Sequence, residues 1–146
     1  MLTNLEHLGL AVRDLAAATD LYTRLLGQVP YKTEHVASEA VDTVFFQIGG
    51  SKIELLAGTS PDSAITRFLE KKPEGIHHVA FEVDNIVAEM ARLRAEGFTL
   101  LNEVPKRGAD NKLVCFVHPK SAGGVLVELC QTAAVTDTVD TGPRPN

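Results

Sequence analysis

The sequence predicts an α+β fold made of two paired modules, in each of which a strand is followed by a helix and then by further strands. The first observation is an internal repeat, because residues 7–12 resemble residues 78–83 and each segment begins with a histidine. The second is that each segment is followed by an acidic residue and an apolar stripe of helical period. The third is a glutamate within an apolar run, 47 positions after His7 in one copy (Glu54) and 50 positions after His78 in the other (Glu128).

The first module is expected to span about residues 5–58. Residues 7–12 alternate between two faces, which is typical of a half-buried strand. Asp14 can cap the helix that follows and Gly27 can end it, and its buried stripe is formed by Leu15, Ala18, Tyr22 and Leu25. Residues 41–48 and 52–56 read as strands on either side of a turn that contains two glycines.

The second module is expected to span about residues 76–131, after a short amphipathic helix at 62–71. Asp84 or Asn85 caps its main helix, Gly97 ends it, and the apolar stripe is Ile86, Met90 and Leu93. Residues 113–117 and 125–129 are the further strands. We therefore expect a single domain over residues 1–132. Residues 133–146 are rich in Thr, Asp and Pro without an apolar pattern, and this predicts a flexible tail.

Length, charge, apolar runs and cysteine content argue against several classes of protein. The chain has 146 residues, 45% of them hydrophobic, which suffices for one buried core. Its net charge of −5 argues against nucleic acid as a partner. We find no signal peptide and no apolar run near the roughly 20 residues needed to cross a bilayer. Cys115 and Cys130 lie in apolar runs, which favours free buried thiols in a reducing compartment over a disulfide. A cytoplasmic protein without a membrane partner is expected.

The strand pattern places the repeated polar side chains on one face. Because side chains alternate along a strand, His7 shares a face with Gly9 and Ala11, while the bulky residues between them face the other way. By the same alternation Glu54 and Glu128 oppose the apolar residues on either side of them. Both carboxylates therefore leave the apolar layer in the same sense as the histidines.

Two histidines and two carboxylates on the inner wall of a curved sheet would be unfavourable to bury without a partner. A divalent metal ion satisfies all four, and this donor set suits cobalt, zinc, manganese or nickel. The sequence thus predicts a metal site formed by His7, Glu54, His78 and Glu128. His77 is expected to point to the opposite face and not to bind the ion. His35 is expected to be solvated, and His118 to be a turn residue.

These features resemble the vicinal oxygen chelate superfamily, which includes glyoxalase I, ring-cleaving dioxygenases and antibiotic-resistance proteins. Several segments are more similar to the methylmalonyl-CoA epimerase family, and the resemblance runs from about residue 5 to residue 131. The segments are residues 53–56, 75–81, 105–109 and 118–129. The resemblance implies paired βαβββ modules that curl into a cup, commonly as a homodimer. It also assigns the metal ligands to His7, Glu54, His78 and Glu128.

Two positions depart from the epimerase pattern. Some epimerases carry Gln where this chain has Glu54, an acid that glyoxalase I-like members also use. Some place a glutamate proposed as a base on the strand at residues 40–44, and by our alignment Thr43 takes that position. A threonine is not an efficient base, so the second proton-transfer group is left open.

The resemblance implies metal-dependent epimerisation of (R)- and (S)-methylmalonyl-CoA through an enolate, with cobalt as the first choice of ion. A carboxylate removes the proton between the thioester and the carboxylate, and an acid on the other side returns one. Glu128 is expected to take one of these two roles. The opposite-face group is Glu54, a water or a residue that the sequence does not identify. Lys106, Arg107, Lys112 and Lys120 can meet the CoA phosphates or be ordinary solvated side chains.

Three other functions compete with this one. A glyoxalase I-like lyase would use the same ion on a glutathione hemithioacetal. A ring-cleaving dioxygenase binds iron through two histidines and one carboxylate, and a fourth ligand at Glu54 crowds that arrangement. A non-enzymatic binding protein of the resistance type usually lacks the quartet, which is complete here.

Overall fold

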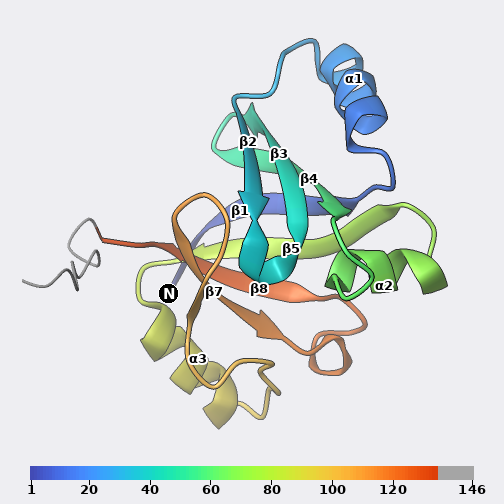
Figure 1. The fold of residues 1–146 in the computed structure, drawn as a ribbon. Coiled ribbons are helices and arrows are strands. Elements are labelled where there is room, and N and C mark those ends of the chain that lie inside the picture. The colour runs from blue at the N-terminus through green and yellow to red at the C-terminus, as the bar shows by residue number, and fades with distance from the viewer. Residues whose placement is uncertain (135–146) are drawn as a thin grey trace, which may run out of the picture.

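The structure, a computed structural model, describes residues 1–134, which form one eight-stranded mixed sheet curled into a cup, with three α-helices on the outside of the cup and two short 3-10 helices (Figure 1). The predicted tail at 133–146 lies outside these residues from position 135 onward. Among the described residues, no helix is long and apolar enough to cross a membrane. Cys115 and Cys130 are free and buried, as expected.

Each module contributes a strand, a helix and three further strands. The elements of the first are β1 (Leu2–Ala11), α1 (Leu15–Leu26), β2 (Lys32–Val36), β3 (Val41–Ile48) and β4 (Ser51–Gly58). The elements of the second are β5 (Gly75–Val83), α3 (Ile86–Ala95), β6 (Lys106–Arg107), β7 (Lys112–Val117) and β8 (Val127–Thr132). Helix α2 (Ala64–Lys71) links the two modules, and the 3-10 helices are η1 (Ala37–Glu39) and η2 (Pro119–Ser121). The α+β fold with paired βαβββ modules is confirmed.

The strand order β2-β3-β4-β1-β5-β8-β7-β6 places the first strand of each module at the centre of the sheet. Strands β1 and β5 are antiparallel to each other. Each runs parallel to the last strand of its own module, β1 beside β4 and β5 beside β8. The two modules are therefore joined through the same strand in each copy, which gives the sheet an approximate two-fold symmetry.

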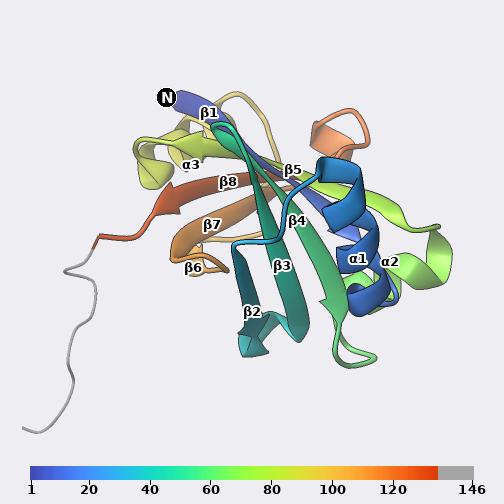
Figure 2. The same ribbon diagram turned by 90° about the horizontal axis from the view of Figure 1, so that it is seen from above.

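Helices α1 and α3 cover the outer face of the sheet, each on its own module, and they lie on opposite sides of the molecule in Figure 2. Asp14 and Asn85 cap them through side-chain hydrogen bonds of 3.0 Å. The expected stripe of α3 is buried, but in α1 the last contact is made by Leu26 instead of Leu25, which is 69% exposed. With about 3.6 residues per turn, Leu26, eleven residues after Leu15, lies almost on the same side of the helix as Leu15 and therefore faces the sheet. Leu25, ten residues after Leu15, is turned away from it.

Strands β2 and β6 did not stand out in the sequence. Strand β2 is largely polar, and it lies at the edge of the sheet, where one side of the strand faces solvent. Strand β6 is two residues long and exists through its pairing with β7. Neither can be recognised from hydrophobic periodicity, because that signal needs a buried face several residues long.

The two edges of the cup are joined by a charged loop between β6 and β7. Asp110 accepts hydrogen bonds from Lys52 (2.7 Å) and Lys32 (3.1 Å) of the first module. Its backbone amide donates to the carboxylate of Glu34 (2.9 Å). Asp110 and the following Asn111 both have positive φ, 57° and 55°, which Asp and Asn tolerate better than most residues. We call this set of contacts the Asp110 clasp.

Asp110→Asn is expected to lower the free energy of unfolding by about 1–2 kcal/mol, because two lysines lose a charged acceptor. Burial by itself raises the pKa of Asp110, but hydrogen bonds from Lys52 and Lys32 hold it below the ordinary value of 3.8. A lowered pKa stabilises the fold above about pH 3.8, and the gain is lost as the pH falls through the folded-state pKa. Urea titrations of both proteins at pH 7 and at the lowest pH at which the unaltered protein still folds test this, because the difference should shrink only below the lowered pKa. A difference that is the same at both pH values would contradict the assignment.

Candidate functional site

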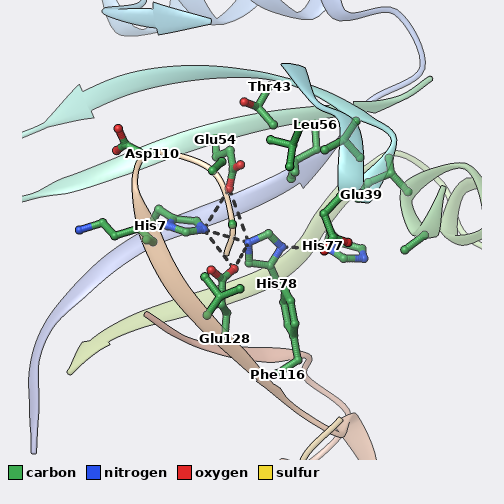
Figure 3. A pocket seen from close by; sticks show the side chains of 18 of the residues that line it. His7, Glu39, Thr43, Glu54, Leu56, His77, His78, Asp110, Phe116 and Glu128 are labelled. Atoms are coloured by element: carbon green, nitrogen blue, oxygen red, sulfur yellow. Dashed lines mark hydrogen bonds and ion pairs between the residues drawn. The ribbon is translucent and has the colours of Figure 1, made fainter. Parts of the chain in front are cut away.

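The four residues singled out by the repeat come from the four central strands of the sheet. His7 lies on β1, Glu54 on β4, His78 on β5 and Glu128 on β8, and these strands are neighbours in the order β4-β1-β5-β8. Gly9 pairs with both Glu54 and His78, and Ala80 pairs with both His7 and Glu128. The side chains point toward one another on the inner wall of the cup (Figure 3).

The polar atoms of these side chains converge on one point. The Nε2 atoms of His7 and His78 lie 2.9 Å apart. Glu54 Oε2 lies 3.0 Å from His7 Nε2 and 3.7 Å from His78 Nε2. Glu128 Oε2 lies 3.5 Å from His7 Nε2 and 3.0 Å from His78 Nε2. All four residues are buried, with 4–6% of their surface exposed.

The electrostatics of the cluster call for positive charge at its centre. Burial alone would raise the pKa of Glu54 and of Glu128, but the two imidazoles hold the pKa of both carboxyls below the ordinary value. Burial alone would lower the pKa of His7 and of His78, but the two carboxylates raise it in both. The two buried carboxylates are thus kept ionised by positive charge on the imidazoles, and a divalent cation at the same point would have the same effect on them.

The donor set fits a divalent metal ion. Ligand atoms of His7, Glu54 and His78 all lie within 4.8 Å of one another, so these three residues can hold an ion. Glu128 Oε2 stands at 3.0 Å and 3.5 Å from the same two imidazole nitrogens. Both histidines present Nε2 to the shared point, while Nδ1 of His7 is buried without a hydrogen-bond partner within the described residues. Imidazole and carboxylate ligands suit borderline divalent ions.

A cavity of about 310 Å³ opens above the cluster. One part of its wall is apolar and comes from β3, β4, α2 and the segment before β8, namely Val41, Leu56, Ala64, Ile65 and Leu126. The other part is charged and includes Glu6, Glu39, Lys106, Asp110 and Lys112. An apolar pocket with a few convergent polar groups is the usual form of a small-molecule site.

The orientation expected for His77 is wrong. The pairing of β1 with β5 shifts register between Gly9 and Leu10, so His77 lies in a β-bulge and its side chain does not cross to the outer face. Its Nδ1 lies 2.9 Å from Nδ1 of His78, and its ring packs edge-on against Phe68. Burial, and then the charge of His78, lower the pKa of His77 to about 4. It lines the cavity but is not one of the residues whose ligand atoms converge at its base.

The structure also shows which residues could stand in for the second base that some epimerases carry at the position of Thr43. Thr43 is buried in the cavity wall, where its hydroxyl donates to the backbone carbonyl of Glu34 (3.3 Å). Glu39, at the end of η1, reaches the same cavity and pairs with Lys106 at 2.6 Å. Figure 3 shows Glu39 beside His77, away from Glu128. Glu39 carried no signal in the sequence, because its partner lies 67 positions away on an edge strand.

Of the four basic residues considered for CoA phosphates, three make contacts within the protein. Lys106 pairs with Glu39, and Arg107 donates to Asn111 (3.3 Å). Lys112 is buried and donates to Thr132 (2.8 Å), so it is not the solvated side chain that one interpretation expected. His35 is exposed and pairs with Asp42, and His118 accepts from the Lys120 amide in a turn, as expected.

Comparisons with known proteins agree with this geometry. The model of the Glyoxalase/Bleomycin resistance protein/Dioxygenase superfamily matches residues 6–116. Mitochondrial methylmalonyl-CoA epimerase of Mus musculus is 43% identical over 131 residues, which cover 89% of this chain and 74% of that protein. Ethylmalonyl-CoA/methylmalonyl-CoA epimerase of Cereibacter sphaeroides is 41% identical, with 90% of this chain and 99% of that one covered.

A solved structure gives the same result at the level of the fold. Streptomyces coelicolor methylmalonyl-CoA epimerase, a variant in complex with 2-nitronate-propionyl-CoA, superposes with a TM-score of 0.88 at 35% identity and covers 92% of this chain and 100% of that one. The duplicated modules, the strand order and the similarity over most of both sequences lead to one assignment. The chain belongs to the glyoxalase/bleomycin resistance/dioxygenase superfamily and, within it, to the methylmalonyl-CoA epimerase family.

Proposed function

We propose that this protein interconverts (R)- and (S)-methylmalonyl-CoA by removing the proton at C2 and returning one to the opposite face. The observation that carries the proposal is the convergence of His7, Glu54, His78 and Glu128 at the base of a cavity whose wall is partly apolar and partly charged. Family membership supports an acyl-CoA substrate, since the relatives are named for this reaction. We further propose that it acts as a homodimer in the cytoplasm.

The four residues would hold a divalent ion, for which cobalt is our first choice and zinc, manganese and nickel are the alternatives. When bound, such an ion acts as a Lewis acid that stabilises negative charge on the thioester oxygen. The protein contributes the rest of the site. The sheet fixes the positions of the ligands, and Val41, Leu56 and Ile65 form an apolar part of the cavity wall that would exclude water from the reacting centre.

Glu128 is the proposed base on one face of C2. Without the ion, the imidazoles of His7 and His78 outweigh the effect of burial and lower the pKa of the Glu128 carboxyl to about 2; a bound divalent ion would supply the positive charge in their place. Two carboxylates are available for the other face. Glu54 belongs to the ligand cluster, as we expected from the sequence. Glu39 approaches from the cavity rim, where Lys106 holds its side chain in place at 2.6 Å.

Glu128→Gln is expected to slow exchange of the C2 proton by about 10²–10⁴-fold, the usual contribution of a general base. The measurement is proton NMR of methylmalonyl-CoA in D2O with the cobalt-loaded protein. Glu82→Gln is the matched control, because Glu82 lies on the neighbouring strand β5 outside the cavity and makes no side-chain hydrogen bond or ion pair within residues 1–134. Absence of exchange in the unaltered cobalt-loaded protein would exclude this substrate and direct the assay to a glutathione hemithioacetal.

Gly9 tests the arrangement of the cluster without removing a polar group. A Cβ at Gly9 would overlap the ring of His78, so Gly9→Ala must displace that imidazole. We expect proton exchange to fall about 10²-fold, because small misplacements in an active site have effects of this size. Gly50→Ala is the matched control, since a Cβ there meets nothing within 4 Å. Equal exchange rates in the two variants would mean that the position of His78 does not matter for the reaction.

A further inference from the structure

Each of the two cluster histidines follows a residue that lies in a β-bulge. On β1, Leu5 pairs with Phe81 and His7 with Ala80, which leaves Glu6 as the extra residue. On β5, His78 pairs with Gly9 and Ile76 with Leu10, which leaves His77 as the extra residue. The two bulges therefore occupy equivalent positions in the two modules. Bulges re-aim side chains that would otherwise point to the opposite face of a sheet.

The re-aimed side chains lie beside Nδ1 of the following histidine. Nδ1 of His77 is 2.9 Å from Nδ1 of His78. The Glu6 carboxylate oxygen Oε1 is 3.6 Å from Nδ1 of His7, and that nitrogen is buried and has no hydrogen-bond partner among the described residues. Both histidines thus present Nε2 to the centre of the cluster and Nδ1 to the preceding residue of the same strand.

The chemistry of imidazole gives this arrangement a role. A neutral imidazole that uses Nε2 as a ligand carries its proton on Nδ1, and an acceptor at Nδ1 fixes both the tautomer and the ring orientation. Glu6 and His77 offer acceptors of different kinds, a carboxylate and a ring nitrogen. Glu6 is 3% exposed, and a carboxylate this deeply buried needs partners to remain ionised.

Lysines of both modules supply those partners. Lys52 donates to Glu6 Oε1 at 2.8 Å and to Asp110 at 2.7 Å, and Lys112 lies 4.0 Å from the same oxygen of Glu6. Glu6 is therefore connected to the Asp110 clasp through a single ammonium group. His77 is held in another way, by edge-on packing against Phe68 at a centroid distance of 4.9 Å.

We propose that Glu6 and His77 are paired positioning residues for the metal site. With the ion bound, the Glu6 carboxylate, 3.6 Å from Nδ1 of His7 in this structure, moves close enough to accept a hydrogen bond from Nδ1–H. His77 Nδ1, already 2.9 Å away, accepts one from Nδ1–H of His78, so that both Nε2 atoms face the ion. This inference rests on the metal centre of the proposed function. It assigns a use to a buried carboxylate and to a buried histidine that the reaction itself leaves unexplained.

The test measures cobalt(II) binding by Glu6→Gln and His77→Phe. Each variant should bind cobalt about 10- to 100-fold more weakly, as is usual when a partner of a ligand histidine is removed. The visible d–d bands of the bound cobalt ion should also change, because they depend on the geometry of its ligands and one imidazole ligand is no longer held in a fixed orientation. Glu82→Gln and His35→Phe are the controls, which remove the same groups away from the cluster and should bind like the unaltered protein.

The outcomes separate this inference from the proposed function. If the unaltered protein does not bind cobalt, the metal centre fails and the positioning roles fail with it. If it binds cobalt and both variants bind as tightly with unchanged d–d bands, the positioning roles alone are overturned. A variant with a lower urea midpoint but unchanged affinity and bands also overturns them, because Glu6 or His77 then serves the fold alone. If Glu6→Gln does not fold, Glu6→Asp keeps the charge beside Lys52, withdraws it from Nδ1 and should show the same loss.

Discussion

The antiparallel pairing of β1 with β5 is the constraint on which the site depends. Each module by itself places one histidine and one carboxylate on the inner face of its strands, and neither pair can enclose an ion. When β1 and β5 pair, Gly9 and Ala80 come to lie opposite the polar residues of the other copy. Small residues at these positions leave the space that the imidazoles occupy, and a Cβ at Gly9 would remove it. The cluster of four polar residues therefore exists only because the two modules pair through β1 and β5.

A second consequence concerns charge. The cavity holds five carboxylates, those of Glu6, Glu39, Glu54, Asp110 and Glu128. The three outside the ligand cluster are each matched by a lysine, through Lys52 or Lys106. Glu54 and Glu128 have only the two imidazoles as partners within residues 1–134. The protein thus neutralises its peripheral carboxylates by itself and leaves the central pair to a cation.

The outer face of the sheet carries the apolar residues that hold the strands in place. Apolar residues that alternate with the polar ones pack against α1 and α3, and this packing fixes the strands that carry the cluster. Ile53 and Leu55 flank Glu54 in this way, and Val127 and Leu129 flank Glu128. Because buried side chains fit closely, a shift of a strand large enough to separate the four polar groups would also disrupt the core.

The sequence by itself determined the two modules, the central strands, the N-cap of α1 and the four residues of the cluster, whereas the structure decided that Asn85, not Asp84, caps α3. Alternation and helical period are local properties, and the repeat showed which local features belong together. Only the tertiary structure decided where His77, Glu6, Glu39 and Asp110 lie. The first two depend on β-bulges, which break alternation and are set by pairing with a distant strand. Glu39 and Asp110 depend on ion pairs with Lys106 and Lys52, which lie 67 and 58 positions away, and no local pattern shows such pairs.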